Sequence, residues 1–172
     1  MKKKICLSVM LGILCCALSM AQEAKRLSVG LGVEGNMNTH EYAAFGGSVV
    51  VEYGITDAWA AGIRFTTSYN FTDMLVFDPM AFGRLYVFKL PVLSAVLGSG
   101  TLLGGLYAEA GVGAAVVLQT EYEAATTVLG EVAVGWRFTF GDWYVEPSVR
   151  GGVPFLWGVS VGGGYRINLK KK

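Results

Sequence analysis

Hydrophobic and polar residues alternate with a period of two along residues 128–151. The pattern is interrupted only by Gly141-Asp142 and resumes after it. Alternation on both sides of a Gly-Asp pair predicts a β-hairpin, and glycine in first place suits a type II′ turn. The apolar parity carries Val128, Val132, Val134, Trp136, Phe138, Phe140, Trp143, Val145, Pro147 and Val149.

A two-residue turn also sets the register of this hairpin. Phe140 should face Trp143, and Arg137 should face Glu146. The polar face is therefore predicted to carry a cross-strand ion pair, while the opposite face is almost wholly apolar. A sheet with lipid on one side and a narrow polar lumen on the other has these two faces.

The same alternation recurs along the chain and predicts eight strands separated by turns or polar segments. The predicted strands are residues 25–35, 43–53, 59–69, 80–89, 102–118, 128–140, 143–151 and 156–169. We expect the longest loop at 70–79, and residues 91–100 form an apolar connector. An even number of strands returns the chain to the side where it began, which places short turns there and longer loops on the other side.

These elements predict an all-β protein, an eight-stranded antiparallel up-and-down transmembrane β-barrel. About 9–11 residues per strand suffice to cross a bilayer, and barrel closure satisfies every backbone group. An interfacial aromatic girdle is expected at the short-turn end from Tyr53, Trp59, Phe140 and Trp143. The alternative is a soluble lipocalin-like barrel with reversed faces, which would enclose Trp136, Phe138, Trp143 and Val145.

The first 21 residues combine a basic start, an apolar core and the small residues Ser19 and Ala21. This pattern predicts a secretory signal peptide that is cut after Ala21, and therefore export to the cell outer membrane. All the cysteines lie in this segment, at Cys6, Cys15 and Cys16. Residues 22–172 are predicted to form one barrel domain that has no disulfide and no cysteine-based site.

Ten charged residues are assigned to the inward parity: Glu34, Glu52, Arg64, Arg84, Glu109, Glu131, Arg137, Glu146, Arg150 and Arg166. Their charges balance, and an unpaired ion in a confined lumen is costly, so we expect a paired Arg–Glu network in which Glu131 lies diagonally from Arg150. The network either closes the lumen or lines a narrow, gated pathway. Closure is favoured because an eight-stranded barrel is just wide enough for its own side chains. Further inward bulk is expected from Phe82, Tyr86 and Phe88.

The last predicted strand contains SVGGGYRI, in which Ser160, Gly162, Tyr165 and Ile167 fit the positions of a barrel assembly signal. By this motif and by its strand pattern, the chain resembles the small outer-membrane β-barrels of diderm bacteria, of the OmpA transmembrane, OmpX and OmpW types. The segment WYVEPSVRGGVPFLWG is also similar to the closing strands of small spirochaetal barrels. The resemblance implies two partners, outer-membrane lipid and the barrel assembly machinery. Such barrels often end on phenylalanine, whereas this chain ends on Lys172.

The predicted loops carry acidic residues and no lysine or arginine: Glu41, Asp73, Asp78, Glu121 and Glu123. Barrels in lipopolysaccharide commonly hold its phosphates with basic residues at this rim. An acidic rim favours a membrane poor in lipopolysaccharide, or loops that bind cations or a basic surface or host ligand. A merely solvated rim is the plainer interpretation. The sequence shows no basic, aromatic-interleaved patch for nucleic acid.

Nothing in the sequence indicates an enzyme or a cofactor. The sole histidine, His40, lies in a predicted loop beside Glu41, and the candidate nucleophile Ser68 has no motif around it. Glu121 and Glu123 lack the further oxygen ligands of a calcium site. Two functions follow: a barrel with a closed lumen that serves membrane structure or surface interaction through its loops, or a narrow porin-like channel for ions or small solutes, including hydrophobic ones.

Overall fold

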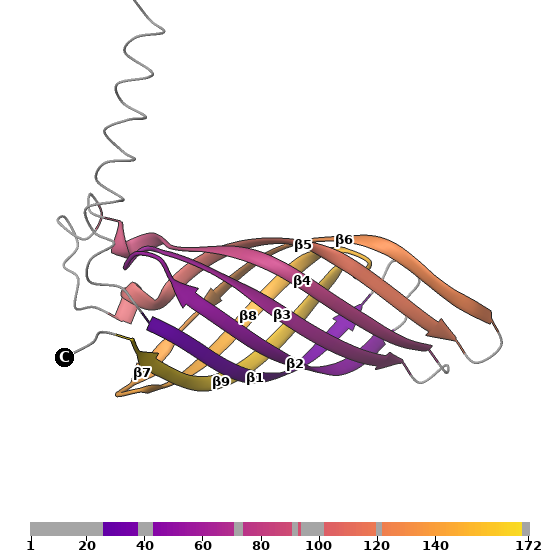
Figure 1. The fold of residues 1–172 in the computed structure, drawn as a ribbon, viewed down its shortest axis with the longest axis horizontal. Helices are drawn as coiled ribbons and strands as arrows, with labels where there is room; N and C mark the ends of the chain where they lie inside the picture. Colours follow the sequence, from indigo (N-terminus) through magenta and orange to yellow (C-terminus); the bar gives the residue numbers. More distant parts are fainter. Residues whose placement is uncertain are drawn as a thin grey trace, which may run out of the picture.

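The computed structural model describes residues 26–37, 43–70, 74–90, 93, 102–119 and 122–169. Its strands are β1 Arg26–Met37, β2 Ala43–Gly54, β3 Trp59–Asn70, β4 Met74–Tyr86, β5 Leu106–Gln119, β6 Tyr122–Trp136, β7 Phe138–Phe140, β8 Trp143–Val153 and β9 Trp157–Asn168. They form one antiparallel sheet in the order β6-β5-β4-β3-β2-β1-β9-β8-β7, and β6 also pairs with β8, so the sheet closes into a barrel (Figure 1).

Strands β6 and β7 follow one another along the same line of the barrel wall and are separated only at Arg137. We call each such line of the wall a stave, whether it holds one strand or two. The backbone N–H of Arg137 donates to the carbonyl of Gly105, at 2.9 Å, which continues the pairing with β5. On the other side the pairing with β8 is interrupted opposite Pro147, which has no N–H to donate. The register is the same on both sides of this break, because Gly135 pairs with Ser148 and Phe138 pairs with Val145. The barrel therefore has eight staves, as predicted.

The hairpin between β7 and β8 has the predicted register, with Phe140 paired to Trp143. Gly141 takes a φ of 63°, the left-handed value that glycine adopts at little cost and that a type II′ turn requires at this position. The prediction of a two-residue turn at Gly141-Asp142 is confirmed.

The two parities of the strands face opposite sides of the barrel wall, as predicted. Leu31, Val33 and Val112 are 67–68% exposed on the outer surface, whereas the polar parity is buried inside. Trp143 and Val145 also belong to the outer face, with 64% and 43% of their surface exposed. The reversed faces of a lipocalin-like barrel are therefore wrong for this chain.

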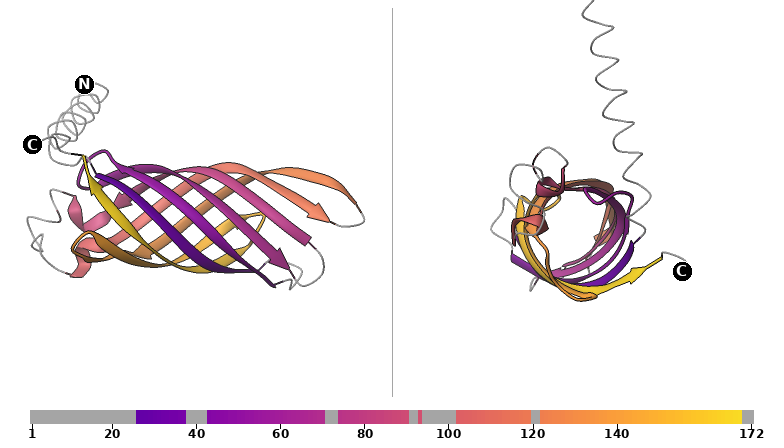
Figure 2. Two further views of the ribbon diagram at one scale, coloured as in Figure 1. Left: turned by 60° about the horizontal axis from the view of Figure 1, so that its bottom comes forward. Right: turned by 90° about the vertical axis from the view of Figure 1, so that its left-hand side faces the viewer.

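Aromatic side chains are exposed at both ends of the barrel. We call the end where β1 begins and β9 ends the terminal mouth, and the opposite end the far mouth (Figure 2). Outside the terminal mouth lie the predicted girdle residues Tyr53, Trp59, Phe140 and Trp143. Outside the far mouth lies a second group, Phe45, Tyr69, Phe77 and Trp157. Aromatic belts at two levels are typical of a barrel that crosses a bilayer.

Strand β4 corrects the prediction of a long loop at 70–79. It begins at Met74, and residues 74–79 pair with β3 in register. Asp78 and Pro79 interrupt only the pairing with β5, since proline has no N–H to donate. Strand β4 ends at Tyr86, so the predicted strand residue Phe88 lies instead in the 3₁₀ helix η1, Val87–Lys89.

The predicted contrast between short and long loops is also wrong. At the far mouth the connections are short, covering 38–42, 71–73, 120–121 and 154–156. At the terminal mouth they cover 55–58 and 141–142, but also 87–105, which contains η1 and the second 3₁₀ helix, η2 Leu102–Gly105. The far loops are short because the strands continue: β5 and β6 project beyond the rest of the barrel (Figures 1 and 2).

Several predictions fall outside the described residues. These concern the signal peptide, His40 and the acidic residues Glu41, Asp73 and Glu121. Within the described ranges, no helix has the length and apolar character needed to span a membrane.

Candidate functional site

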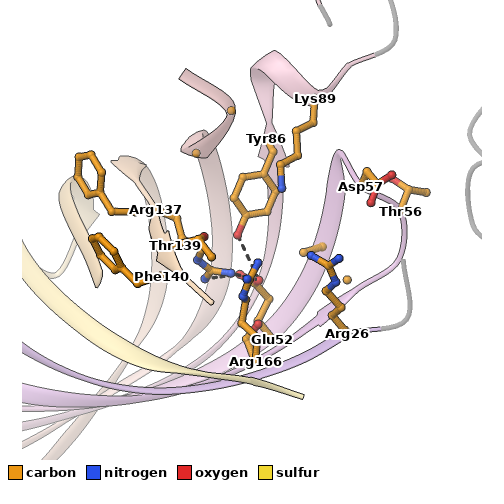
Figure 3. A pocket seen from close by; sticks show the side chains of 16 residues that line it. Arg26, Glu52, Thr56, Asp57, Tyr86, Lys89, Arg137, Thr139, Phe140 and Arg166 are labelled. Atoms are coloured by element: carbon orange, nitrogen blue, oxygen red, sulfur yellow. Dashed lines mark hydrogen bonds and ion pairs between the residues drawn. The ribbon is translucent and has the colours of Figure 1, made fainter. Parts of the chain in front are cut away.

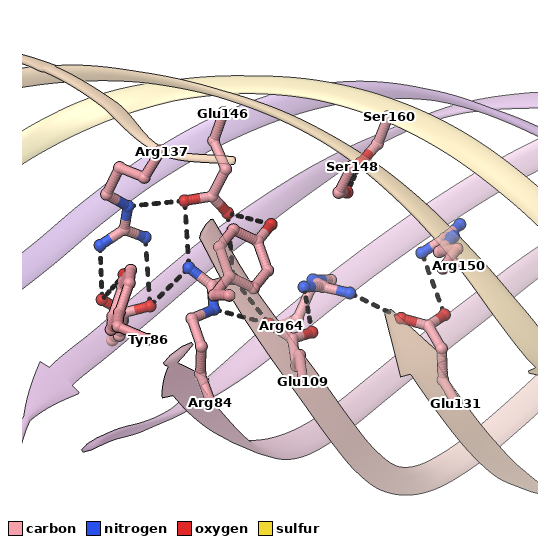
Figure 4. A network of polar contacts seen from close by, with 12 residues as sticks. Arg64, Arg84, Tyr86, Glu109, Glu131, Arg137, Glu146, Ser148, Arg150 and Ser160 are labelled. Carbon is pink, nitrogen blue, oxygen red and sulfur yellow. Dashed lines mark hydrogen bonds and ion pairs between the residues drawn. The ribbon is translucent and has the colours of Figure 1, made fainter. Parts of the chain in front are cut away.

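The lumen holds a continuous network of ion pairs that runs along the barrel axis (Figure 4). Each member comes from a different position on the inner parity of the wall, so strands far apart in sequence contribute to one cluster. Its members are Glu34, Glu52, Arg64, Arg84, Glu109, Glu131, Arg137, Glu146 and Arg150.

Arg84 is the centre of this network and is fully buried. Its guanidinium contacts three carboxylates: Glu109 Oε2 at 2.6 Å, Glu52 Oε2 at 2.7 Å and Glu146 Oε1 at 3.0 Å. The guanidinium carbon also lies 3.9 Å from the centre of the Tyr107 ring, a cation–π geometry. Five fixed donors let one arginine satisfy several acceptors, which lysine could not do in the same plane.

Arg137 closes the network toward the terminal mouth. Its Nε donates to Glu146 Oε2 at 2.6 Å, so the two residues predicted to face each other are in contact. Its Nη1 and Nη2 donate to the two oxygens of Glu52, at 2.6 and 3.1 Å. The same carboxylates accept hydrogen bonds from tyrosine hydroxyls, Tyr86 on Glu52 and Tyr107 on Glu146, at 3.2 and 2.9 Å.

Arg64 and Arg150 extend the network toward the far mouth through Glu131. Arg64 contacts Glu131 at 2.7 Å and Glu109 at 2.5 Å. Arg150 contacts Glu131 at 3.3 Å, the predicted diagonal pair, and Glu34 at 2.5 Å. Every arginine in the chain of contacts therefore bridges at least two acids.

An apolar cluster fills the lumen beside this end of the network. Its buried members are Val76, Met80, Phe82, Ala115 and Leu129. The spaces left near the far half of the network are small, about 30 Å³ and about 10 Å³. Cavities of this size have room for a few water molecules but not for a larger solute.

Two residues depart from the predicted network. Arg166 forms no ion pair with a described residue; its Nη2 donates to the carbonyl of Gly141 at 2.5 Å, because the end of β9 lies at the terminal mouth. Asp78, which was expected in an acidic loop, is instead 4% exposed and faces the lumen. Pro79 made the sequence resemble a loop here, although the alternating parity continues through Asp78 into Met80.

The charge balance of the lumen consequently differs from the prediction. Six lumen carboxylates share four arginines in the described part of the chain; four of the six are buried, and Glu131 and Glu146 are partly buried. Glu34 Oε2 and Asp78 Oδ1 are buried without a hydrogen-bond partner among the described residues. The network is thus fully paired around Arg84 and has surplus acid at its far end.

The lumen opens at the terminal mouth into a cavity of about 410 Å³, which we call the cup (Figure 3). Its floor is the Glu52–Arg137 pair, and its walls come from β1, β2, η1, η2, β7 and β9. Three cations around it, Arg26, Lys89 and Arg166, form no ion pair with a described residue. The sequence did not indicate the cup, because residues 80–89 and 102–118 were predicted as strands and residues 91–100 only as an apolar connector.

The candidate nucleophile Ser68 and possible metal ligands can be placed in the described part of the chain. Ser68 is fully buried in the lumen, where its hydroxyl donates to Glu34 at 3.0 Å and accepts from Asn36 at 3.0 Å, so it is not at a membrane rim. Among the residues that the structure places, no group of three histidine, cysteine, aspartate or glutamate side chains is arranged to hold a metal ion.

Comparison with known proteins gives a likeness in structure only. No protein-family model matches the chain, and no curated protein does. The outer membrane protein OprG from Pseudomonas aeruginosa matches with a TM-score of 0.55 and 9% identity over 85% of this chain and 97% of that chain. This chain has the fold of the small outer-membrane β-barrels.

Two further small outer-membrane β-barrels show the same likeness. The N-terminal β-barrel domain of Pseudomonas aeruginosa OprF has a TM-score of 0.53 and 15% identity over 81% of this chain and 97% of that chain. Neisserial surface protein A has a TM-score of 0.52 and 11% identity over 83% and 95%. The shared property is the closed eight-stranded architecture that the sequence predicted.

The residues of the suspected assembly signal lie along β9, as in a final barrel strand. Tyr165 and Ile167 face outward, and the Tyr165 ring packs edge-on against Trp143 with ring centres 5.1 Å apart. Ser160 faces inward, 2.6 Å from the hydroxyl of Ser148, and Gly162 lies between the two groups on the strand.

Proposed function

We propose that this chain is an exported, integral outer-membrane barrel with a closed lumen, which serves membrane structure and surface interaction and is not an enzyme. The observation that carries the proposal is the packing of the lumen. An ion-pair network centred on Arg84 and an apolar cluster around Phe82 occupy the interior together, and the two cavities that the described residues line along the far half measure about 30 and about 10 Å³.

The surroundings we propose for the barrel are outer-membrane lipid. The outward residues are apolar along every stave, and aromatic side chains end this surface at both mouths. We further propose that the signal peptide is cut after Ala21 and that the barrel assembly machinery recognises Ser160, Gly162, Tyr165 and Ile167. Mass spectrometry of protein purified from the outer-membrane fraction of a diderm host tests the first of these; an intact mass that includes residues 1–21 would contradict it.

The surface that we propose for interaction is the projecting β5–β6 hairpin. Residues 122–129 of β6 pair with β5 alone in the described part of the chain, so one backbone edge stays open there. An open edge accepts a strand from a partner, and residues 124–128 are exposed. The acidic residues Glu41, Asp73 and Glu121 remain candidates for a basic surface or host ligand.

The alternative function, a narrow porin-like channel, is favoured by one observation. The wall formed by β1, β2, β8 and β9 presents small inward residues, and the larger of the two far voids lies along it. Ions or small solutes, including hydrophobic ones, would have to pass there. Its small lining residues are Gly30, Gly32, Ser48, Ser148, Ser160 and Gly162.

Conductance across planar bilayers distinguishes the two functions. Folded protein, verified by heat-modifiable gel mobility, should be electrically silent if the lumen is closed. Arg137→Ala then serves as the second sample, since it removes the contacts to both Glu52 and Glu146. A closed barrel should lose stability and leak only in the variant, whereas a channel should show steady steps in the wild type whose size or selectivity changes in the variant.

A further inference from the structure

The cup at the terminal mouth has an excess of positive charge. Its lining includes four cations and two carboxylates: Arg26, Lys89, Arg137, Arg166, Glu52 and Asp57. Glu52 is already used, because it accepts from Arg137 and from Arg84 at 2.6 and 2.7 Å. The remaining three cations therefore surround the cavity with only Asp57 to balance them.

The cationic groups converge on one space. In Figure 3 the Lys89 ammonium points down into the cup beside Tyr86, with its nitrogen 4.8 Å from the centre of that ring. The guanidinium groups of Arg26 and Arg166 point toward the same region from the opposite wall. The Nε of Arg166 is buried and has no hydrogen-bond partner among the described residues.

Like charges gathered in a partly buried space repel one another, and an anion relieves that repulsion. Burial lowers the pKa of Lys89; Asp57 opposes this effect, and the three lining arginines lower the pKa further. The hydroxyls of Thr56 and Thr139 also line the cavity, so neutral hydrogen-bond donors are available beside the charges. Phosphate oxygens are acceptors that guanidinium and ammonium groups bind by charge-assisted hydrogen bonds.

We propose that the cup binds a compact phosphate-bearing anion at the terminal mouth, held by Lys89, Arg166 and Arg26. A cavity of about 410 Å³ is large enough for a diphosphate or a glycerophosphate headgroup, and the Glu52–Arg137 floor stops the anion from entering the lumen. This site goes beyond the proposed function, since it exists whether or not the lumen conducts.

Isothermal titration with inorganic pyrophosphate tests the site on the purified full barrel in phosphatidylcholine nanodiscs. We expect saturable binding near one equivalent that weakens about tenfold in Lys89→Gln and in Arg166→Gln, the loss of one charge-assisted hydrogen bond each. Lys89→Arg should keep most of the affinity. Asp57→Asn should strengthen binding, because it removes the carboxylate that competes with the anion.

Lys89→Arg is the matched control for Lys89→Gln, because it keeps the positive charge at the same position of the cup lining. Heat-modifiable gel mobility verifies that each variant is folded. Absence of saturable binding, or equal weakening in Lys89→Arg and Lys89→Gln, would overturn the proposal. Repeating the titration with phosphatidylglycerol in the nanodisc assigns the source: competition identifies a lipid headgroup as the natural occupant, and unchanged affinity identifies a soluble phosphate compound.

Discussion

Arginines cluster both in the lumen and in the cup, but within the described residues those in the lumen are paired with carboxylates and two of those around the cup are not. In the lumen every arginine bridges at least two carboxylates, and Arg84 touches three. At the terminal mouth Arg26 and Arg166 form no ion pair with a described residue, although they lie within the same barrel end as Arg137. The boundary between the two regions is the Glu52–Arg137 pair.

The difference follows from access to water. A charge enclosed by the barrel wall loses its hydration and must be compensated by partners, whereas a charge at an open mouth keeps part of its hydration. Under the proposed function the paired lumen charges close the barrel, and in the proposed cup site the mouth charges stay available to a ligand. Variants that remove one charge from each region measure this contrast directly.

The largest effect is expected from Arg84→Ala. The substitution leaves Glu52, Glu109 and Glu146 buried with fewer donors, so the free energy of unfolding should fall by about 3–5 kcal/mol. Urea unfolding in lipid vesicles, followed by tryptophan fluorescence, measures it. A loss as small as that of a mouth variant would show that the network does not stabilise the barrel.

The next largest loss in the free energy of unfolding is expected from a charge placed on the outer face. Val149 is 58% exposed near the middle of β8, and Val149→Arg should cost about 2–4 kcal/mol in a bilayer. Val153→Arg, on the same parity at the end of the strand, should cost about 0–1 kcal/mol. The same unfolding assay applies, and equal costs at the two positions would argue against lipid around this face.

Two glycine variants test how tightly the lumen is packed around Phe82. A Cβ at Gly62 would collide with the backbone carbonyl oxygen of Val51 and lie 2.6 Å from the Phe82 ring, whereas a Cβ at Gly83 would meet no atom within 4 Å. Gly62→Ala should therefore destabilise the barrel by about 1–3 kcal/mol, while Gly83→Ala stays near wild type. If both variants unfold alike, the lumen is looser than the contacts around Phe82 indicate.

The smallest change in the free energy of unfolding is expected from a variant at the terminal mouth. Arg26 is exposed and forms no ion pair with a described residue, so Arg26→Ala should change the free energy of unfolding by less than about 0.5 kcal/mol. Compared with Arg84→Ala, it provides the same chemical change in the other region. A large loss in Arg26→Ala would remove the distinction between the cup and the lumen.

The strand parity was enough to predict the wall of the barrel. Each strand shows a single alternation, so the faces of Leu31, Trp143 and Glu109 follow from sequence alone, and closure follows from the count of strands. The first part of strand β4 was predicted as a loop because Asp78-Pro79 is a strong turn signal. Only the pairing of Met74–Phe77 with β3 shows that the sheet continues through it.

The partners inside the lumen could be predicted only within a hairpin. Arg137 and Glu146 are joined by a two-residue turn, which fixes their contact. The contact between Arg137 and Glu52 depends on the stagger of the closed barrel, since β2 and the β6–β7 stave lie on different sides of it. The cup could not be predicted either, because Lys89, Arg26 and Arg166 come together only in the closed barrel.

Cysteine accessibility tests the central claim, a sealed lumen behind an open cup, most directly. The three cysteines of the chain lie at Cys6, Cys15 and Cys16, so a cysteine placed in the barrel reports alone once the predicted signal peptide is removed. Thr139→Cys lies at an exposed position in the lining of the cup, and Ser68→Cys lies fully buried in the lumen beside Glu34. Both variants are treated with a small, uncharged thiosulfonate in folded proteoliposomes.

We predict rapid modification of Thr139→Cys and almost none of Ser68→Cys until the barrel is unfolded, with the modified site identified by mass spectrometry. Comparable rates at the two positions in the folded protein would contradict it and would establish a water-filled path through the lumen.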